Sequence, residues 1–220
     1  MSKDLQFGRR APRSGRAKSL VVFLHGYGAD GEDLLGLADP LAPHLPDTVF
    51  VAPNAPQPCT GNPFGFQWFP IPWLDGSSEA AAAEGMAESA VALNAFLDAR
   101  LAEEGLTDAA MALVGFSQGT MMALEVAPRR AAPVACVVGF SGRLIAPERL
   151  AGEITARPPV LLIHGDRDEM VPPQSMPEAA AALTRAGIET YTQVSPGTAH
   201  GIAPDGLGAA LGFLSDRLPQ

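Results

Sequence analysis

The sequence Gly-Phe-Ser-Gln-Gly at residues 115–119 fits the pattern G-x-S-x-G, whose central serine can attack the carbonyl carbon of an ester. The pattern indicates a nucleophile only between a strand and a helix, because the tight turn there presents the serine hydroxyl at the end of the sheet. An apolar run at 110–114 precedes the motif, and a stretch typical of a helix, 118–127, follows it. We therefore predict that Ser117 is a nucleophile and not a serine that merely caps the helix.

The tetrapeptide Val-Gly-Phe-Ser occurs a second time, at residues 138–141. This copy lacks the G-x-S-x-G spacing and leads into Arg143, Leu144 and Pro147 instead of a helix start rich in small residues. We interpret Ser141 as a residue at the end of a strand that lines the site without reacting.

A serine hydroxyl needs a base within hydrogen-bond reach and an acid that orients the base. After a nucleophile elbow, the acid and then the histidine follow along the chain. Only His200, in the glycine-containing loop 196–201, satisfies this order among the four histidines. We predict that His200 is the base. The acid is Asp166 or Asp168, and spacing does not separate them because both follow the same predicted strand.

Acyl transfer also needs backbone N–H donors that bind the oxyanion, one of them on the residue after the nucleophile. That residue is Gln118. The second donor is expected from the loop after an early strand, and His-Gly-Tyr-Gly at 25–28 follows the predicted strand 19–24. Glycines in such a loop let the backbone approach a substrate closely.

Residues 53–74, called the aromatic loop below, contain six prolines, both tryptophans and three of the ten phenylalanines. Apolar loops of this length in compact domains usually serve a function, often as lids over binding sites. We expect the loop to cover an apolar pocket beside Ser117 instead of filling the core, and its prolines to keep it out of helix and sheet. The predicted substrate-binding residues are Phe64, Phe66, Trp68, Phe69 and, outside the loop, Ser141.

Short Val-, Leu- and Ile-rich runs alternate with longer Ala- and Leu-rich stretches, which is typical of βα units around a mostly parallel sheet. None of the predicted strands alternates cleanly between apolar and polar residues, so we expect both faces to be covered. The predicted strands are 19–24, 48–52, 110–114, 134–140, 160–164 and 189–194. The predicted helices are 78–104, 118–127, 174–186 and 203–217. The length favours one α/β domain over residues 1–220.

Composition restricts the partners and the location. Lys and Arg number 15 against 24 Asp and Glu, and the net charge of −9 argues against binding to nucleic acid. We find neither a signal peptide nor an apolar run long enough for a membrane span. Two cysteines are too few for a disulfide framework, so we expect a cytoplasmic protein. Metal-ligand spacing and nucleotide-binding motifs are missing, so we expect no metal and no other cofactor.

Four stretches together resemble the phospholipase/carboxylesterase family of α/β-hydrolases, which includes bacterial carboxylesterases and acyl-protein thioesterases. They lie at 23–28, 115–124, 164–172 and 197–201, in the family's order. The resemblance implies an α/β-hydrolase fold with helices on both faces of the sheet. It also implies that the acid is Asp168, the last aspartate of His-Gly-Asp-Arg-Asp, and that Tyr27 and Gln118 supply the oxyanion-hole amides.

Acyl-protein thioesterases carry Trp-Tyr-Asp where this chain has Trp-Phe-Pro at 68–70, which favours a small-ester hydrolase over a depalmitoylating enzyme. We predict a serine carboxylesterase that cleaves small-molecule esters of small to medium acyl chains through an acyl-enzyme on Ser117. The alternative is an acyl thioesterase or lysophospholipase with the same triad. A non-catalytic binding protein is less favoured because all three triad positions are filled. Whether two chains form a homodimer stays open.

Overall fold

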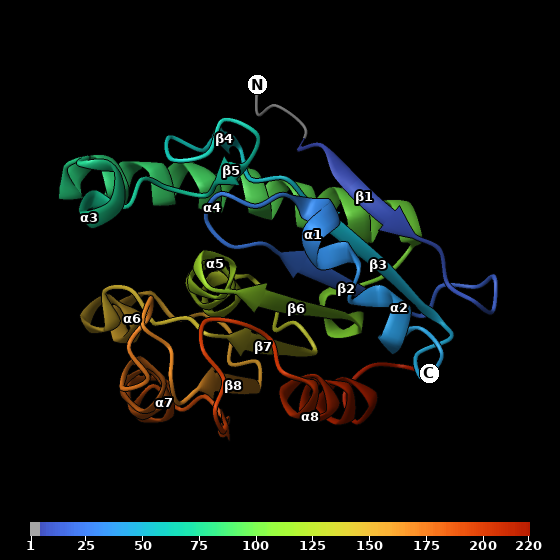
Figure 1. The fold of residues 1–220 in the computed structure, drawn as a ribbon. Coiled ribbons are helices and arrows are strands. Elements are labelled where there is room, and N and C mark those ends of the chain that lie inside the picture. The colour runs from blue at the N-terminus through green and yellow to red at the C-terminus, as the bar shows by residue number, and fades with distance from the viewer. Residues whose placement is uncertain (1–4) are drawn as a thin grey trace.

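A seven-stranded sheet forms the centre of the computed structural model, which describes residues 5–220 (Figure 1). Its strands lie in the order β1-β3-β2-β6-β7-β8-β9. β1 is antiparallel to β3, and the other neighbouring pairs in this sheet are parallel, which confirms the predicted mostly parallel sheet. The strand bounds are β1 Phe7–Arg10, β2 Ser19–Leu24, β3 Thr48–Pro53, β6 Met111–Phe116, β7 Cys136–Phe140, β8 Val160–Gly165 and β9 Thr190–Ser195.

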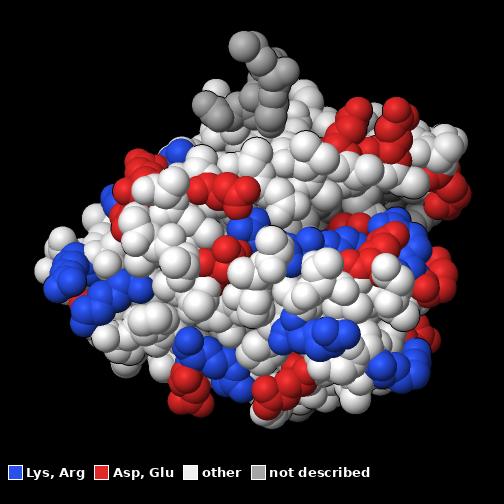
Figure 2. All heavy atoms as spheres, turned by 180° about the vertical axis from the view of Figure 1, so that it is seen from behind, with Lys and Arg blue, Asp and Glu red and all other residues white. Residues whose placement is uncertain are grey.

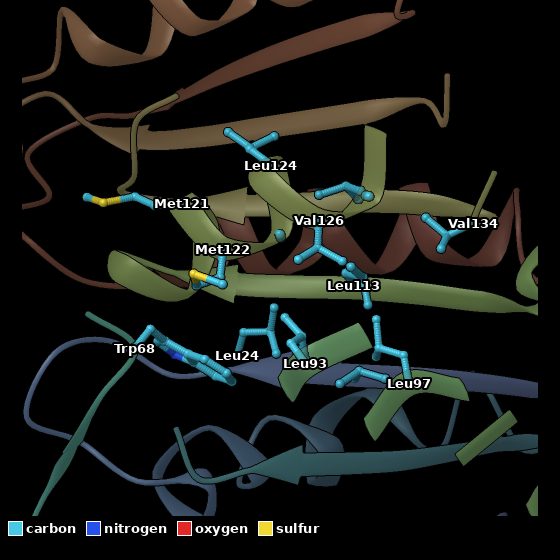
Figure 3. Close-up of a cluster of buried hydrophobic side chains, with 14 of the residues drawn as sticks. Leu24, Trp68, Leu93, Leu97, Leu113, Met121, Met122, Leu124, Val126 and Val134 are labelled. Atoms are coloured by element: carbon cyan, nitrogen blue, oxygen red, sulfur yellow. The ribbon is translucent and has the colours of Figure 1, made fainter. Parts of the chain in front are cut away.

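Helices cover both faces of this sheet, as predicted (Figure 1). One face carries α4 (Glu79–Glu104), α5 (Gln118–Val126) and α7 (Ser175–Arg185), and the other carries α1 (Gly31–Leu35), α2 (Ala38–Leu41) and α8 (Pro204–Ser215). Successive residues of β2 point to opposite faces, so Val22 and Leu24 join the first cluster and Val21 and Phe23 the second. Figure 3 shows the first cluster, where side chains of α4 and α5 meet those of β2 and β6.

Three parts of the fold differ from the prediction. β9 is an edge strand with exposed Tyr191 and Val194, so the expectation that every strand is covered on both faces is wrong there. The prolines do not keep the aromatic loop out of regular structure, because it contains the short antiparallel pair β4 (Gln57–Pro58) and β5 (Phe66–Gln67) and the helix α3 (Pro72–Asp75). The prediction also lacks β1 and the short helices α1, α2, α3 and α6 (Pro147–Glu153).

The local sequence explains both ends of α4. The Ser78 hydroxyl accepts a hydrogen bond from the Ala81 N–H at 3.1 Å, and Gly105 ends the helix at a φ of 67°. Its buried apolar stripe includes Leu93, Phe96, Leu97 and Leu101. The buried Ser89 hydroxyl of α4 donates a hydrogen bond to the Trp68 carbonyl, so this helix also holds the aromatic loop.

The surface carries charges of both signs. On the face in Figure 2, acidic and basic side chains are interspersed over a largely uncharged surface. Between residues 5 and 220, no helix has both the length and the apolar character required to cross a membrane. Within the same residues, no three His, Cys, Asp or Glu side chains are grouped so that they could hold a metal ion.

Candidate active site

Ser117 occupies a strained turn between β6 and α5. Its backbone has φ 53° and ψ −115°, a conformation that non-glycine residues rarely adopt. The turn is tight on both sides: a Cβ at Gly119 would lie 1.8 Å from the Leu24 carbonyl oxygen, and one at Gly115 would lie 2.4 Å from the Thr120 nitrogen. Only glycine fits these two positions, so the motif is required for the turn to close.

The structure brings Ser117, His200 and Asp168 into one hydrogen-bonded chain. The Ser117 Oγ lies 3.0 Å from Nε2 of His200, and Nδ1 of His200 lies 2.8 Å from Oδ2 of Asp168. An ionised carboxylate only accepts hydrogen bonds, so Nδ1 carries the proton and Nε2 is free to accept the serine proton. His200 lies in the loop after β9, and Asp168 lies in the loop after β8.

The side chain of Asp168 is buried, and both of its carboxylate oxygens accept hydrogen bonds. Its Oδ1 accepts from the N–H groups of Met170 and Val171, each at 2.9 Å, and its Oδ2 lies 3.2 Å from Nε2 of His164. Burial on its own would raise the pKa of the Asp168 carboxyl. The hydrogen bonds from His200, Val171 and Met170 outweigh burial and hold that pKa below its ordinary value, so the carboxylate stays charged.

Asp166, the other candidate acid, points elsewhere. It is exposed, and its Oδ1 accepts a hydrogen bond from the Gly197 N–H at 2.6 Å. Asp166 therefore ties the loop that carries His200 to the loop after β8. Asp168, and not Asp166, therefore contacts His200, in agreement with the family resemblance.

The two expected oxyanion-hole amides lie on either side of Ser117. Tyr27 is in the turn after β2 and lines the same cavity as Ser117, and Gln118 is the first residue of α5. Among the described residues, neither backbone N–H donates a hydrogen bond to a protein acceptor. Both are therefore available to a negatively charged oxygen near Ser117.

Side chains around these amides fix the aromatic loop in place. Oε1 of Gln118 accepts from the Trp68 N–H at 2.8 Å, and Nε2 of Gln118 donates to the Phe69 carbonyl at 2.7 Å. The Trp68 indole N–H donates to the His25 carbonyl at 3.0 Å, and Nε2 of His25 accepts from the Ala55 N–H at 2.9 Å. Both segments that carry an oxyanion amide are thus bound to the loop.

An apolar cavity of about 180 Å³ opens beside Ser117 and His200. The aromatic loop contributes Ile71, Trp73 and Leu74 to its lining. Met170, from the loop that contains Asp168, also lines it and is 57% exposed, as Trp73 is 59% exposed. These side chains form an apolar rim where an acyl or alcohol group can lie next to the reacting serine.

This lining corrects the predicted substrate-binding residues, none of which lines the cavity beside Ser117. Phe64 is 89% exposed at the tip of the loop, and Trp68 is fully buried among core side chains. Phe66 packs against the same core, and Phe69 lines a neighbouring cavity. Ser141 is buried under the sheet end. The loop both fills the core with Trp68 and covers the pocket with its later residues.

Sequence analysis missed several contacts of the site. Met170 and Val171 hold Asp168 through their backbone, and their position two and three residues after the aspartate is the signal that the sequence offers. His164 was assigned no role, yet it lies against Asp168. The Phe116 ring, within the serine motif, lies 4.9 Å from the His200 ring, measured between centroids.

A strained serine between strand and helix, followed along the chain by an aspartate and a histidine that meet it, is the arrangement found in serine hydrolases with an α/β-hydrolase fold. The comparison with known families makes this class more specific. The chain belongs to the phospholipase/carboxylesterase family, whose sequence model matches residues 11–218.

Individual relatives cover almost the whole chain. The crystal structure of esterase PE8 is 46% identical and superposes with a TM-score of 0.94, over 98% of this chain and 100% of that one. Esterase YpfH of Escherichia coli (strain K12) is 26% identical over 204 residues, which cover 93% of this chain and 85% of that protein. Acyl-protein thioesterase 1 of Saccharomyces cerevisiae is 28% identical over 222 residues, with coverages of 96% and 97%.

Proposed function

We propose that the protein is a serine carboxylesterase that hydrolyses small-molecule esters, with Ser117 as nucleophile, His200 as base and Asp168 as the acid that orients it. The observation that carries the proposal is the unbroken hydrogen-bonded chain from Ser117 through His200 to Asp168. The esterase names of two relatives, PE8 and YpfH, support the same activity. The apolar cavity at the serine supports an acyl group of small to medium length.

In the first half of the reaction, the Ser117 Oγ attacks the ester carbonyl while Nε2 of His200 takes the hydroxyl proton. The carbonyl oxygen becomes an oxyanion that the N–H groups of Tyr27 and Gln118 stabilise. Protonated His200 then gives its proton to the leaving alkoxide as the C–O bond breaks. Asp168 stabilises the positive charge on His200 during these steps. The alcohol is released, and the acyl group stays bonded to the Ser117 oxygen as the acyl-enzyme.

In the second half, water attacks the acyl-enzyme, and His200 takes one of its protons. The tetrahedral intermediate collapses, the bond to Ser117 breaks and His200 returns the proton to the serine oxygen. A carboxylic acid leaves. The same steps cleave an acyl thioester or a lysophospholipid, and the acyl-protein thioesterase relatives favour thioester hydrolysis as the second candidate.

Further parts of the proposal concern the setting of the enzyme. We propose that residues 1–220 act as one catalytic domain with a cytoplasmic location, which the low cysteine content supports. The net charge of −9 supports a neutral small molecule over nucleic acid as partner. A homodimer is not needed for the site, since all the residues named above come from one chain.

Kinetics on graded substrates test the proposal. Wild-type protein is assayed with p-nitrophenyl esters and acyl thioesters of two to twelve carbons, and turnover of the esters is expected to dominate. Ser117→Ala should lose about a millionfold in kcat, the usual effect of removing a triad nucleophile. Ser141→Ala is the matched control and should keep most of the activity. Equal turnover by wild type and Ser117→Ala would refute the assignment, and a preference for thioesters would select the second candidate.

A further inference from the structure

A second cavity, of about 150 Å³, adjoins the one at Ser117. The two cavities share Ile71 and Trp73 in their linings, so they lie next to each other. The lining of the second cavity is mainly apolar and includes Phe69 and Met86, with Arg143 at its edge. Arg143 lies against the Trp73 ring, with its Cζ 4.8 Å from the ring centroid.

Within residues 5–220, no carboxylate forms an ion pair with the Arg143 guanidinium. Arg143 is partly buried, and its buried Nε has no hydrogen-bond partner among the described residues. The other arginine that lines this cavity, Arg149, is paired with Glu125 and Glu153. Glu79, the acidic residue in the lining, is exposed, and within residues 5–220 no ion pair joins it to Arg143. Among the described residues, Arg143 and Glu79 are therefore the charged residues of this lining without an ion-pair partner, and Arg143 is the positively charged one.

The backbone holds Arg143 close to the reacting serine. A Cβ on the preceding residue, Gly142, would lie only 3.0 Å from the Ser117 carbonyl oxygen, so the two segments are in direct contact. Two non-glycine residues that flank this segment, Ser141 and Ala146, each have φ 47°. Strained backbone of this kind costs energy and persists where the surroundings fix it, often at functional sites. Arg143 is thus placed by a fixed segment beside the elbow.

The edge of a guanidinium can bind a ligand while its face lies against an aromatic ring, as the Arg143 guanidinium lies against Trp73. A planar guanidinium binds a carboxylate through two parallel N–H bonds at this edge, and stacking on an aromatic ring is compatible with that geometry. The rest of the molecule, with a net charge of −9, repels anions. An anionic substrate therefore needs a local cation next to the pocket.

We infer that Arg143 is a specificity-determining residue that binds a carboxylate on the substrate, so that the enzyme favours monoesters of dicarboxylic acids over neutral esters of equal length. The inference rests on the proposed function, because it assigns a substrate class to the same site. The ester end lies at Ser117, the connecting methylene groups lie along Trp73, and the carboxylate meets Arg143.

The test compares monomethyl adipate with methyl hexanoate, which carries a methyl group in place of the carboxylate. Acid release is followed in a pH-stat, and the readout is the ratio of kcat/KM for the two esters. Arg143→Gln should lower this ratio about tenfold, the size expected for one charge-assisted hydrogen bond. Arg143→Lys, which keeps the charge but loses the planar fork, should lower it less. Added salt should lower the wild-type ratio.

Arg13→Gln is the matched control, because it removes the same charge from an exposed loop at the other end of the sheet and should leave the ratio unchanged. An unchanged ratio in Arg143→Gln would overturn the inference. A loss that is equal for both esters would also overturn it, since Arg143 would then only support Trp73.

Calorimetric binding of adipate separates this inference from the proposed function. Adipate should bind wild type and Ser117→Ala alike and bind Arg143→Gln about tenfold more weakly. If neither ester is hydrolysed but this binding difference appears, the proposed esterase activity fails and the carboxylate site stands. Equal adipate binding by wild type and Arg143→Gln would count against the site whatever the ester rates are.

Discussion

Asp166 and Asp168 are two residues apart on one loop, yet they have different surroundings. Asp168 is turned inward, where two backbone N–H groups and His200 hold its carboxylate. Asp166 is turned outward and holds Gly197. The lowered pKa of Asp168 means that its carboxylate is ionised at neutral pH. An acid limb of activity near neutral pH must therefore come from another group.

Asp168→Asn should lower kcat by about ten-thousandfold, because the amide nitrogen of asparagine cannot accept the Nδ1–H of His200 and the wrong tautomer results. Asp166→Asn should stay within a few-fold of wild type, since the amide oxygen of asparagine still accepts the Gly197 N–H. Steady-state kinetics at pH 8 give both values, with circular dichroism as the check on folding. A larger loss of kcat in Asp166→Asn than in Asp168→Asn would show that Asp166, and not Asp168, is the acid of the triad.

The same pair illustrates what sequence predicts at the scale of residues. The motif around Ser117 and the order of the chain suffice to select the serine and His200. Asp166 and Asp168 share one loop and one residue type, so spacing does not separate them, whereas in the structure His200 and the amides of Met170 and Val171 bind Asp168. The predicted substrate-binding residues do not line the cavity at Ser117, because the backbone path of the aromatic loop depends on hydrogen bonds with Gln118, which lies about fifty residues away in sequence.

At the scale of elements, the two parts of the aromatic loop have different roles: the part up to Phe69 anchors the loop, and the part after Phe69 lines the pocket. Up to Phe69 it is bound to α4 and α5 through buried hydrogen bonds. After Phe69 it supplies Ile71, Trp73 and Leu74 to the pocket. Elements with a long apolar period, such as α4, were predictable, whereas helices of four to seven residues show no period that could be recognised.

Trp73→Ala should change the dependence of kcat/KM on acyl-chain length. Trp73 lines both cavities, so its removal enlarges the apolar space beside Ser117 and should move the optimum to longer acyl chains. Each methylene that becomes buried is worth about fourfold in kcat/KM, from about 0.8 kcal/mol per group. The measurement is a series of p-nitrophenyl esters from two to twelve carbons.

Phe64→Ala is the control for Trp73→Ala, because Phe64 is 89% exposed and lines neither cavity. Its chain-length profile should match that of wild type. If Phe64→Ala shifted the profile and Trp73→Ala did not, the pocket lining described above would be wrong. A fall in melting temperature for Trp73→Ala with an unchanged profile would make Trp73 a packing residue.

At the scale of the whole molecule, the buried His25 joins the sheet to the aromatic loop and makes the stability of the fold depend on pH. His25 follows β2, is fully buried and uses both ring nitrogens: Nδ1 donates to the Gly26 carbonyl at 2.7 Å, and Nε2 accepts from the Ala55 N–H at 2.9 Å. This pattern requires the neutral ring, since a protonated ring has no nitrogen left to accept. The loop and the sheet are therefore joined through a group that must stay uncharged.

Burial lowers the pKa of His25 below 6.5, against smaller opposing effects of the Gly26 hydrogen bond and of Asp30 and Asp33. In the unfolded chain its pKa is about 6.5. Below that pH the unfolded state binds a proton that the folded state does not, so acidification favours unfolding. We expect His25 to lower the free energy of unfolding by up to about 1.4 kcal/mol per pH unit between pH 6.5 and the folded pKa.

Urea unfolding at pH 7.5 and 5.5 measures this contribution. His25→Gln should be less stable at pH 7.5, because hydrogen bonds are lost, but its stability should fall less on acidification than that of wild type. His44→Gln, which removes an exposed histidine, should keep the wild-type difference between the two pH values. If His25→Gln does not fold, the imidazole signals of His25 in wild type are followed by NMR and should titrate below pH 6.5. Titration above 6.5, or an unchanged pH dependence in His25→Gln, would show that another group couples acid to unfolding.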